Sequence, residues 1–268
     1  MKTQIFYFSG TGNSLYIAKE LAKEISNTTL QPIISVLSMD KIVIEAEKIG
    51  FVFPIHAFSI PEPVKQFLKR VNIKTNSYIF AVATRGGSPC RVFKEIDKIL
   101  EKKDKKLDAQ FFINMPNNYL PIFEVAPQEE ILKLQGETKD RIGFIKDIII
   151  NNKESKEKDS HGSFIEENIL FPVLTQVFHK TGYFNTQNKF YSDDKCTSCK
   201  ICSEICLSGK IKMKDGKPKW DKNIQCTYCF ACIHYCPVKA IQIKNTKTNV
   251  RGRYHHEGID GGDIASQK

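Results

Sequence analysis

The first half of the chain alternates short apolar runs with segments in which apolar residues recur at helical spacing. The apolar runs are nearly continuous, as expected for strands buried on both faces of a parallel sheet. Helical patterns begin near Ser14, after Pro61 and after Pro89. This alternation predicts an α/β fold with a doubly wound parallel sheet. The predicted strands are Gln4–Phe8, Pro32–Leu37, Ile49–Phe53, Ser77–Thr84 and Gln110–Met115.

The second half carries a different pattern. Residues Gln128–Ile150 and Phe164–Lys180 are predicted to be helical, and the charged run between them, Asn151–His161, is predicted to be an exposed turn. The cysteine-rich segment Tyr191–Ile243 consists of two similar halves. The spacer between the halves contains an Asp-Gly pair, which predicts a small hairpin.

The last residues are polar and rich in glycine, and we expect them to be poorly ordered. The whole pattern predicts a first domain over residues 1–185 and a small second domain over residues 190–245. Residues 246–268 are then a polar tail.

Eight of the nine cysteines form two runs of identical spacing. In each run three cysteines are separated by two residues, and a fourth follows after three more. This is the arrangement of bacterial four-iron sites. Three such thiolates can surround one cluster, whereas the fourth lies past the loop and reaches the neighbouring cluster. We therefore predict two [4Fe-4S] clusters. Cluster I would be held by Cys196, Cys199, Cys202 and Cys236, and cluster II by Cys226, Cys229, Cys232 and Cys206.

Zinc and disulfide bonds are the alternatives for these cysteines. Structural zinc usually takes two pairs of ligands, one from each knuckle, which the observed spacing does not provide. Disulfide frameworks are typical of short secreted chains. The N-terminus enters a strand-like run at once and has no export signal, so we expect a cytoplasmic protein. Cysteine-bound clusters near a surface are usually oxygen-sensitive, so we also expect a reducing, anaerobic setting.

The cysteine segment resembles the bacterial two-cluster ferredoxins over roughly Tyr191–Ile243. Pro237 follows the last cysteine, as that family's pattern requires, whereas Leu207 stands at the equivalent position of the first half. This departure leaves the ligands intact, and we expect it to alter the packing and potential of one cluster.

A glycine-rich loop directly follows the first predicted strand and precedes a helix. Small residues let the backbone approach an anion, and the helix N-terminus adds positive potential. The loop lacks the lysine of a nucleoside triphosphate site, and its spacing differs from the dinucleotide fingerprint. A glycine-rich turn with no ligand is the alternative. The loop consists of Ser9, Gly10, Thr11, Gly12, Asn13 and Ser14.

This hydroxyl-rich loop resembles the phosphate loop of the flavodoxins, which bind FMN. The resemblance implies strand order 2-1-3-4-5, with FMN beyond the carboxyl ends of the strands. The loops after the third and fourth strands would then form the walls around the flavin ring. These walls are Pro54, Ile55, His56, Ala57 and Phe58 on one side and Thr84, Arg85, Gly86 and Gly87 on the other.

Several single residues are candidates for further roles. His56 and Arg85 are candidates for tuning the flavin, and Phe58 is the aromatic residue expected nearest to the ring. The segment 117–119 (Asn-Asn-Tyr) is expected between flavin and clusters. Cys90 has no visible base, and no catalytic residue is predicted. The pair His255-His256 is expected to have a flexible or packing role.

Charge adds a statement about partners. The formal net charge is +10. Eight thiolates on two clusters and one flavin phosphate would lower it to about +4. We therefore expect docking to redox partner proteins, not binding to nucleic acid, and no apolar run is long enough to predict a membrane span.

The order of the two parts resembles the flavodoxin–ferredoxin fusions called flavoferredoxins. The resemblance implies an electron-transfer protein that relays low-potential electrons between clusters and FMN and on to a partner oxidoreductase. The alternatives are a flavin-dependent reductase of a small molecule and, from the charge, a regulatory protein that binds nucleic acid.

Overall fold

The computed structural model describes residues 2–74, 76–86, 91–158, 165, 169–181 and 185–268. Its larger part is a parallel sheet of six strands in the order β2-β1-β4-β6-β7-β8. The first five of these strands have the predicted order, which confirms the doubly wound α/β class. The strands are β1 (Thr3–Tyr7), β2 (Thr28–Pro32), β4 (Lys48–Pro54), β6 (Tyr78–Arg85), β7 (Ala109–Asn114) and β8 (Ser155–Lys156).

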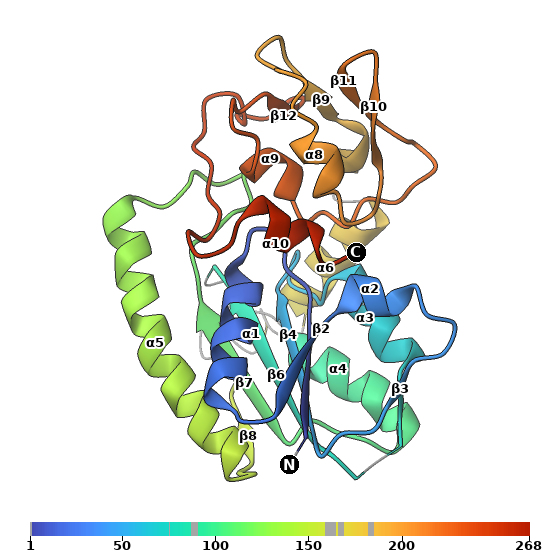
Figure 1. Ribbon diagram of the computed structural model, residues 1–268, viewed down its shortest axis with the longest axis vertical. Helices are drawn as coiled ribbons and strands as arrows, with labels where there is room; N and C mark the ends of the chain where they lie inside the picture. The colour runs from blue at the N-terminus through green and yellow to red at the C-terminus, as the bar shows by residue number, and fades with distance from the viewer. Residues whose placement is uncertain (1, 75, 87–90, 159–164, 166–168, 182–184) are drawn as a thin grey trace.

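Helices cover both faces of the sheet (Figure 1). Helices α1 (Asn13–Glu24) and α5 (Gln128–Ile150) lie together on one face, and α3 (Glu62–Arg70) and α4 (Val92–Leu100) lie together on the other. The sheet between them is apolar throughout because its strands face helices on both sides. Its completely buried side chains include Phe8, Phe51, Phe53, Phe80 and Phe111.

The strand predicted at residues 32–37 is wrong. Strand β2 ends at Pro32, and the following residues form the short helix α2 (Ile33–Leu37). Ile33 and Val36, three residues apart, are the two buried residues of this helix. The apolar run therefore served a helical face and not a strand. A separate two-stranded pair joins β3 (Val43–Ile44) to β5 (Asn72–Ile73).

The exposed turn predicted at residues 151–161 is confirmed at 151–154, which are exposed, but residues 155–156 form strand β8, and residues 159–161 lie outside the described residues. Strand β8 adds to the sheet edge beside β7. Beyond it, the Glu157 carboxylate accepts a hydrogen bond from the Phe112 N–H at 2.9 Å and pairs with Arg141. The buried Lys48 donates to the carbonyls of Ile149 and Ile150 at the end of α5. A lysine there satisfies orphan carbonyls and complements the helix dipole.

The cysteine part is a small α+β unit. Strand β9 (Phe190–Ser192) pairs with β12 (Ile241–Ile243), and β10 (Ile211–Lys214) pairs with β11 (Lys217–Trp220) in the predicted hairpin. Each cysteine half contributes one short helix, α8 (Ile201–Glu204) or α9 (Ala231–His234). Helix α6 (Phe171–Lys180) and a turn of 3-10 helix, η3 (Thr186–Asn188), precede this part. The described helix α6 is shorter than the predicted one, whose first residues lie largely outside the described ranges.

The expectation of a poorly ordered tail is wrong. The last residues run back between the two parts and end in helix α10 (Gly261–Ala265) (Figure 1). Asp260 caps this helix in a reciprocal capping box with Asp263. Ile259 and Ile264 are buried in the main core. The tail is therefore an integral part of the fold.

Within the described residues, no helix has the length and apolar character needed to cross a membrane.

Candidate functional site

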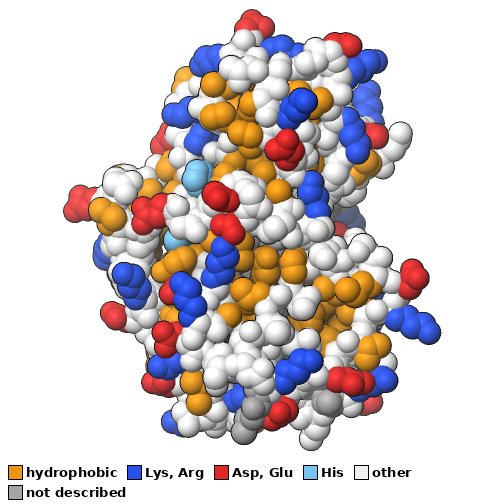
Figure 2. Space-filling model, in the orientation of Figure 1, with side chains coloured by type: hydrophobic (Ala, Val, Ile, Leu, Met, Phe, Trp, Pro, Cys, Tyr) orange, Lys and Arg blue, Asp and Glu red, His pale blue; other side chains and the backbone are white. Residues whose placement is uncertain are grey.

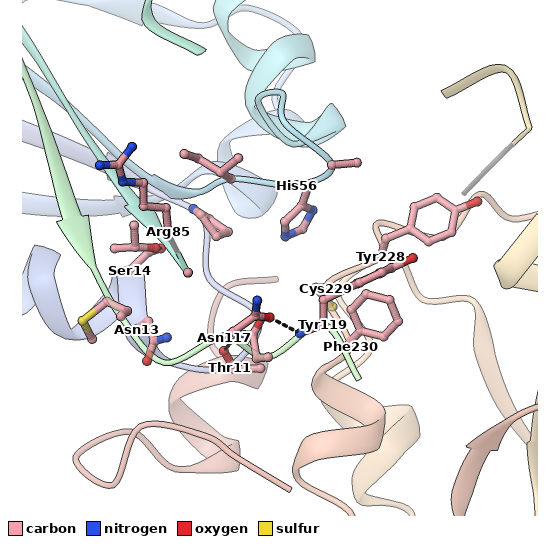
Figure 3. A pocket seen from close by; sticks show the side chains of 18 of the residues that line it. Thr11, Asn13, Ser14, His56, Arg85, Asn117, Tyr119, Tyr228, Cys229 and Phe230 are labelled. Carbon is pink, nitrogen blue, oxygen red and sulfur yellow. Dashed lines mark hydrogen bonds between the residues drawn. The ribbon is translucent and has the colours of Figure 1, made fainter. Parts of the chain in front are cut away.

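An open cavity of about 1150 Å³, its mouth included, lies beyond the carboxyl ends of the central strands. The predicted loop and both predicted walls line it, except for Gly12, which faces elsewhere, and Gly87 and Cys90, which lie outside the described residues. This position is the one expected for a ligand of a doubly wound sheet. Figure 3 shows side chains from both parts of the chain converging on this cavity.

The predicted phosphate loop forms the start of α1. Ser9, Thr11, Asn13 and Ser14 are all nearly inaccessible to solvent. The Ser14 hydroxyl is hydrogen-bonded to the Thr84 hydroxyl at 2.8 Å, which joins the loop to the end of β6. The first N–H groups of a helix have no partner within the helix, so α1 offers donors and positive potential to an anion here.

Gly12 allows the loop to turn into the helix. Its φ of 95° lies in the left-handed region, which favours glycine. A Cβ at this position would lie 2.9 Å from the Ile259 side chain and 3.0 Å from that of His256. Gly12 therefore contacts the tail and not the cavity.

The tail holds the phosphate loop from behind. The Gln267 side chain donates to the Ser9 carbonyl at 2.9 Å and accepts from the Ser9 N–H at 3.0 Å. The His256 N–H donates to the Thr11 carbonyl at 2.8 Å, and the Tyr254 hydroxyl donates to Asn13 Oδ1 at 2.8 Å. The buried polar groups on this side of the loop are thus satisfied by residues of the tail.

The same brace extends to the cysteine part through His234, which lies between Cys232 and Cys236. The Tyr254 N–H donates to His234 Nδ1 at 3.1 Å, so Nε2 carries the proton and donates to the Asn118 carbonyl at 2.9 Å. The Asn118 amide in turn donates to the Thr11 hydroxyl. Burial lowers the pKa of His234 to about 4, which keeps the ring neutral at physiological pH.

The wall after β4 is a tight turn. His56 and Ser59 exchange backbone hydrogen bonds of 3.0 Å, and the two residues between them, Ala57 and Phe58, have φ values of 46° and 65°. Residues other than glycine rarely adopt such values, and they are concentrated at functional sites. The turn presents the ring of Phe58 to the cavity, as expected.

In the wall after β6, Arg85 was expected to tune the flavin, but its guanidinium contacts residues of β7. Its side chain lines the cavity, but its guanidinium lies 4.2 Å from the centroid of the Phe112 ring and donates to Asn114 Oδ1 at 3.1 Å. Both groups belong to β7. The neighbouring Gly86 packs against Asn117, where a Cβ would come within 3.0 Å of the asparagine side chain.

The cysteine part supplies the opposite wall. Tyr228, Cys229 and Phe230 line the cavity, and the Tyr119 ring packs edge-on against Phe230 with centroids 5.4 Å apart (Figure 3). The Tyr119 N–H donates to Asn117 Oδ1 at 2.9 Å. The segment 117–119 therefore lies between the sheet and the cysteine part.

The phosphate loop directly contacts a predicted ligand of cluster II. A Cβ built on Gly10 would lie 2.8 Å from Cys229 Cβ and closer still to its carbonyl oxygen. The two backbones can approach this closely only because residue 10 has no side chain. The predicted phosphate site and one predicted cluster site are thus immediate neighbours.

The four cysteines predicted for cluster I surround one small hollow, together with Met213 and Pro218 of the hairpin. In the part of the chain that the structure describes, no three His, Cys, Asp or Glu side chains are arranged to hold a single metal ion. Four cysteines around one hollow suit a body of several atoms such as a four-iron cubane.

The electrostatic setting also suits iron. Burial, together with the charges of neighbouring cysteines, raises the pKa of the Cys202 and Cys226 thiols to about 12. Among the charges acting on Cys232 are those of Cys226, Cys229 and Cys206, the other predicted ligands of cluster II. Buried thiolates crowded in this way need positive charge, and iron would supply it.

The two cysteine halves share one backbone conformation. The residues on either side of the second cysteine have positive φ in each half: Ser198 (62°) and Lys200 (68°), and Tyr228 (53°) and Phe230 (55°). The Tyr228 N–H lies 3.3 Å from Cys226 Sγ and the Ala240 N–H lies 3.1 Å from Cys236 Sγ. Such N–H groups tune the potential of a cluster that the sulfurs hold.

Sequence reasoning missed the tail and part of the aromatic wall. Tyr254, His256 and Gln267 carry no motif, and their partners are more than 200 residues away. Tyr228 and Phe230 lie between cysteines of the second run, whose spacing predicted cluster ligands but gave no sign that these two residues line the cavity. The ring of His256 stacks on that of Tyr16 at a centroid distance of 4.0 Å, a packing role that was among the expectations.

Comparison with protein families identifies the cysteine part. A family model described as a 4Fe-4S dicluster domain matches residues 195–252. A "Ferredoxin-like protein in nif region" from Trichormus variabilis (strain ATCC 29413 / PCC 7937) is 37% identical over 43 residues. That match covers 16% of this chain and 37% of the relative. The same figures hold for a protein of that name from Trichormus azollae.

Solved structures match about half of the chain at low sequence identity. Rubredoxin oxygen:oxidoreductase from the anaerobe Desulfovibrio gigas matches 56% of this chain and 36% of its own, with 16% identity and a TM-score of 0.35. A putative flavoprotein from Bacteroides uniformis ATCC 8492 matches 50% of this chain and 97% of its own, with 18% identity and a TM-score of 0.32. Since these scores are below 0.5, the fold class rests on the strand order of the chain itself.

The chain therefore contains an iron–sulfur domain of the 4Fe-4S type next to a flavodoxin-like sheet. Four-iron clusters held by cysteines exchange electrons.

Proposed function

We propose that the protein relays low-potential electrons between FMN in the cavity and two [4Fe-4S] clusters, and exchanges them with a partner oxidoreductase. The observation that carries the proposal is the contact between Gly10 and Cys229. It sets the predicted phosphate loop directly against a predicted ligand of cluster II. A short path is what electron transfer between two centres requires.

The residues present fit FMN. The loop at residues 9–14 would receive the phosphate, and Phe58 and Tyr228 would offer aromatic surface to the ring. Ile55 and Gly86 line the two walls on either side. When bound, FMN supplies a centre that exchanges one or two electrons, whereas each cluster exchanges one. The chain's contribution is the distance and orientation of these centres.

The exposure of the cysteines supports an order for the three centres. Cys229 lines the cavity, whereas Cys199 of cluster I is the exposed member of the eight cysteines of the repeat. Cluster II would thus lie between the cavity and cluster I. Electrons from outside would enter or leave at cluster I.

The first test is anaerobic purification followed by absorption spectroscopy and analysis of iron and flavin. We expect about eight iron atoms per chain, a broad cluster absorption near about 400 nm that dithionite bleaches, and one flavin. Protein that remains colourless after cluster reconstitution would contradict the proposal. Clusters without flavin, even after titration with FMN, would leave only the ferredoxin function.

The brace from the tail gives a second prediction. A Tyr254→Phe variant loses the hydrogen bond to Asn13 but keeps the ring. One such bond contributes about 1 kcal/mol, so FMN affinity should fall about fivefold. Quenching of flavin fluorescence on titration of the FMN-free protein measures the affinity. A Tyr191→Phe variant in β9 is the control, and equal affinities for the two variants would show that the brace does not support the loop.

A second candidate function is reduction of a small molecule at the flavin. His56 and Tyr119 line the cavity, and burial raises the pKa of Tyr119, which keeps its hydroxyl available as a proton donor. Steady turnover of a small acceptor, abolished by Tyr119→Phe but not by loss of cluster I, would favour this function over the relay.

A further inference from the structure

The hairpin β10–β11 has two faces of opposite character. On the inner face, Ile211 pairs with Trp220 and Met213 pairs with Pro218. On the outer face every position is a lysine. We call this the lysine face; it consists of Lys212, Lys214, Lys217 and Lys219.

The lysine face brings like charges together. Lys212 lies directly opposite Lys219, and Lys214 lies directly opposite Lys217. Like charges in such positions destabilise a hairpin. Within the described residues none of the four forms an ion pair with a carboxylate, and only Lys217 turns inward, where it donates to the Cys196 carbonyl at 3.0 Å. The other three are exposed. The fold itself gains nothing from this arrangement of charge.

The lysine face lies next to cluster I. The inner face of the same hairpin places Met213 and Pro218 in the hollow formed by the cysteines of that cluster. The exposed Cys199 and Lys200 belong to the facing ligand loop. Figure 2 shows Lys and Arg side chains gathered around the upper end of the molecule, where Figure 1 places β10 and β11.

We propose that the lysine face is the docking site of an acidic electron-carrier protein, one with carboxylates around its own redox centre. This inference rests on the proposed function and names the partner of cluster I. One electron passes in each encounter: the carrier is oxidised as cluster I is reduced, or the reverse, and no proton or further reactant takes part.

A carrier protein fits this surface better than nucleic acid does. The positive charge surrounds the cluster that is nearest to solvent, so complementary charge would bring a second redox centre close to it. Charge complementarity mainly raises the association rate and fixes orientation, which is what a transient electron-transfer complex needs.

The test uses the double variant Lys212→Gln/Lys219→Gln in the cluster-loaded, flavin-loaded protein. The probe is a reduced acidic two-cluster bacterial ferredoxin, and stopped-flow absorption follows electron arrival at about 10 mM and about 500 mM salt. At low salt we expect a second-order rate constant at least about tenfold below that of the unmodified protein, and at high salt nearly equal rates. The thermal unfolding midpoint should be unchanged or higher, because the variant removes a repulsive pair.

The control is Lys133→Gln/Lys139→Gln on α5, which changes the net charge equally at exposed positions far from the hairpin. Equal rate constants for the two double variants at low salt would overturn the proposal. A rate constant of the unmodified protein that does not change with salt concentration would also overturn it. Binding of duplex DNA, and not of the probe, to the lysine face would do the same. Dithionite reduction of the unmodified protein tests the proposed relay separately from docking at the lysine face. If dithionite reduces neither clusters nor flavin, the relay is wrong, whether or not a carrier binds the lysine face.

Discussion

A Cys229→Ser variant is expected to lose fast electron exchange between the flavin and the iron–sulfur part, whereas a Cys199→Ser variant is expected to keep it. Each substitution removes one thiolate from one predicted cluster. The two variants should differ in electron exchange because Cys229 lines the cavity and contacts Gly10, whereas Cys199 is exposed on the outer loop. Only the first change breaks the link nearest to the flavin.

The measurement is photoreduction of the flavin followed by time-resolved bleaching of the clusters. The rate constant should fall at least about tenfold in Cys229→Ser, equivalent to about 1.4 kcal/mol of barrier, and should stay within about twofold in Cys199→Ser. Iron and flavin contents are determined first, so that a lost flavin is not mistaken for a lost path. The reverse result, with Cys199→Ser slow and Cys229→Ser fast, would show that cluster I lies next to the flavin.

A Gly10→Ala variant is expected to disrupt the same junction from the other side. The added methyl carbon would lie 2.8 Å from Cys229 Cβ, well inside van der Waals contact, and its nearest neighbours are backbone atoms that cannot rotate away. Either the phosphate loop or the cysteine loop must move. We expect FMN affinity to fall at least about tenfold, or ~1.4 kcal/mol, while the iron content stays the same.

Gly136→Ala is the matched control for this prediction. Gly136 lies within α5, and a Cβ there meets nothing within 4 Å. Alanine should stabilise the helix by about 0.5–1 kcal/mol and leave the flavin untouched. Flavin titration measures the FMN affinity of both variants, and thermal unfolding measures their stability. If Gly10→Ala binds FMN as tightly as Gly136→Ala does, the two loops are not in the close contact described.

Features that depend on local pattern were predictable from the sequence. The strands at the sheet centre were found because burial on both faces makes their apolar runs continuous. The hairpin was found from its Asp215-Gly216 turn, and both residues do have positive φ. The strand expected at 32–37 failed because a short apolar run fits a helix face as well as a strand.

The rest of the site depends on contacts between distant residues, and these leave no local pattern. The tail reads as polar and glycine-rich, yet its hydrogen-bonding side chains find partners in the phosphate loop 258 residues away in the case of Gln267. The glycines of the tail also suggested poor order, yet Gly261 and Gly262 are the first residues of the capped helix α10. The composition of the tail reflects only its own residues, whereas its ordered structure depends on the residues that it packs against.

The long separation of these partners has a consequence for biosynthesis. The phosphate loop leaves the ribosome early, but the side chains that hold it are synthesised 241 and 258 residues later, after the whole cysteine repeat. A nascent chain that carries the complete sheet would still lack the rear support of its phosphate loop. Tight capture of the flavin would therefore wait until the tail has been synthesised.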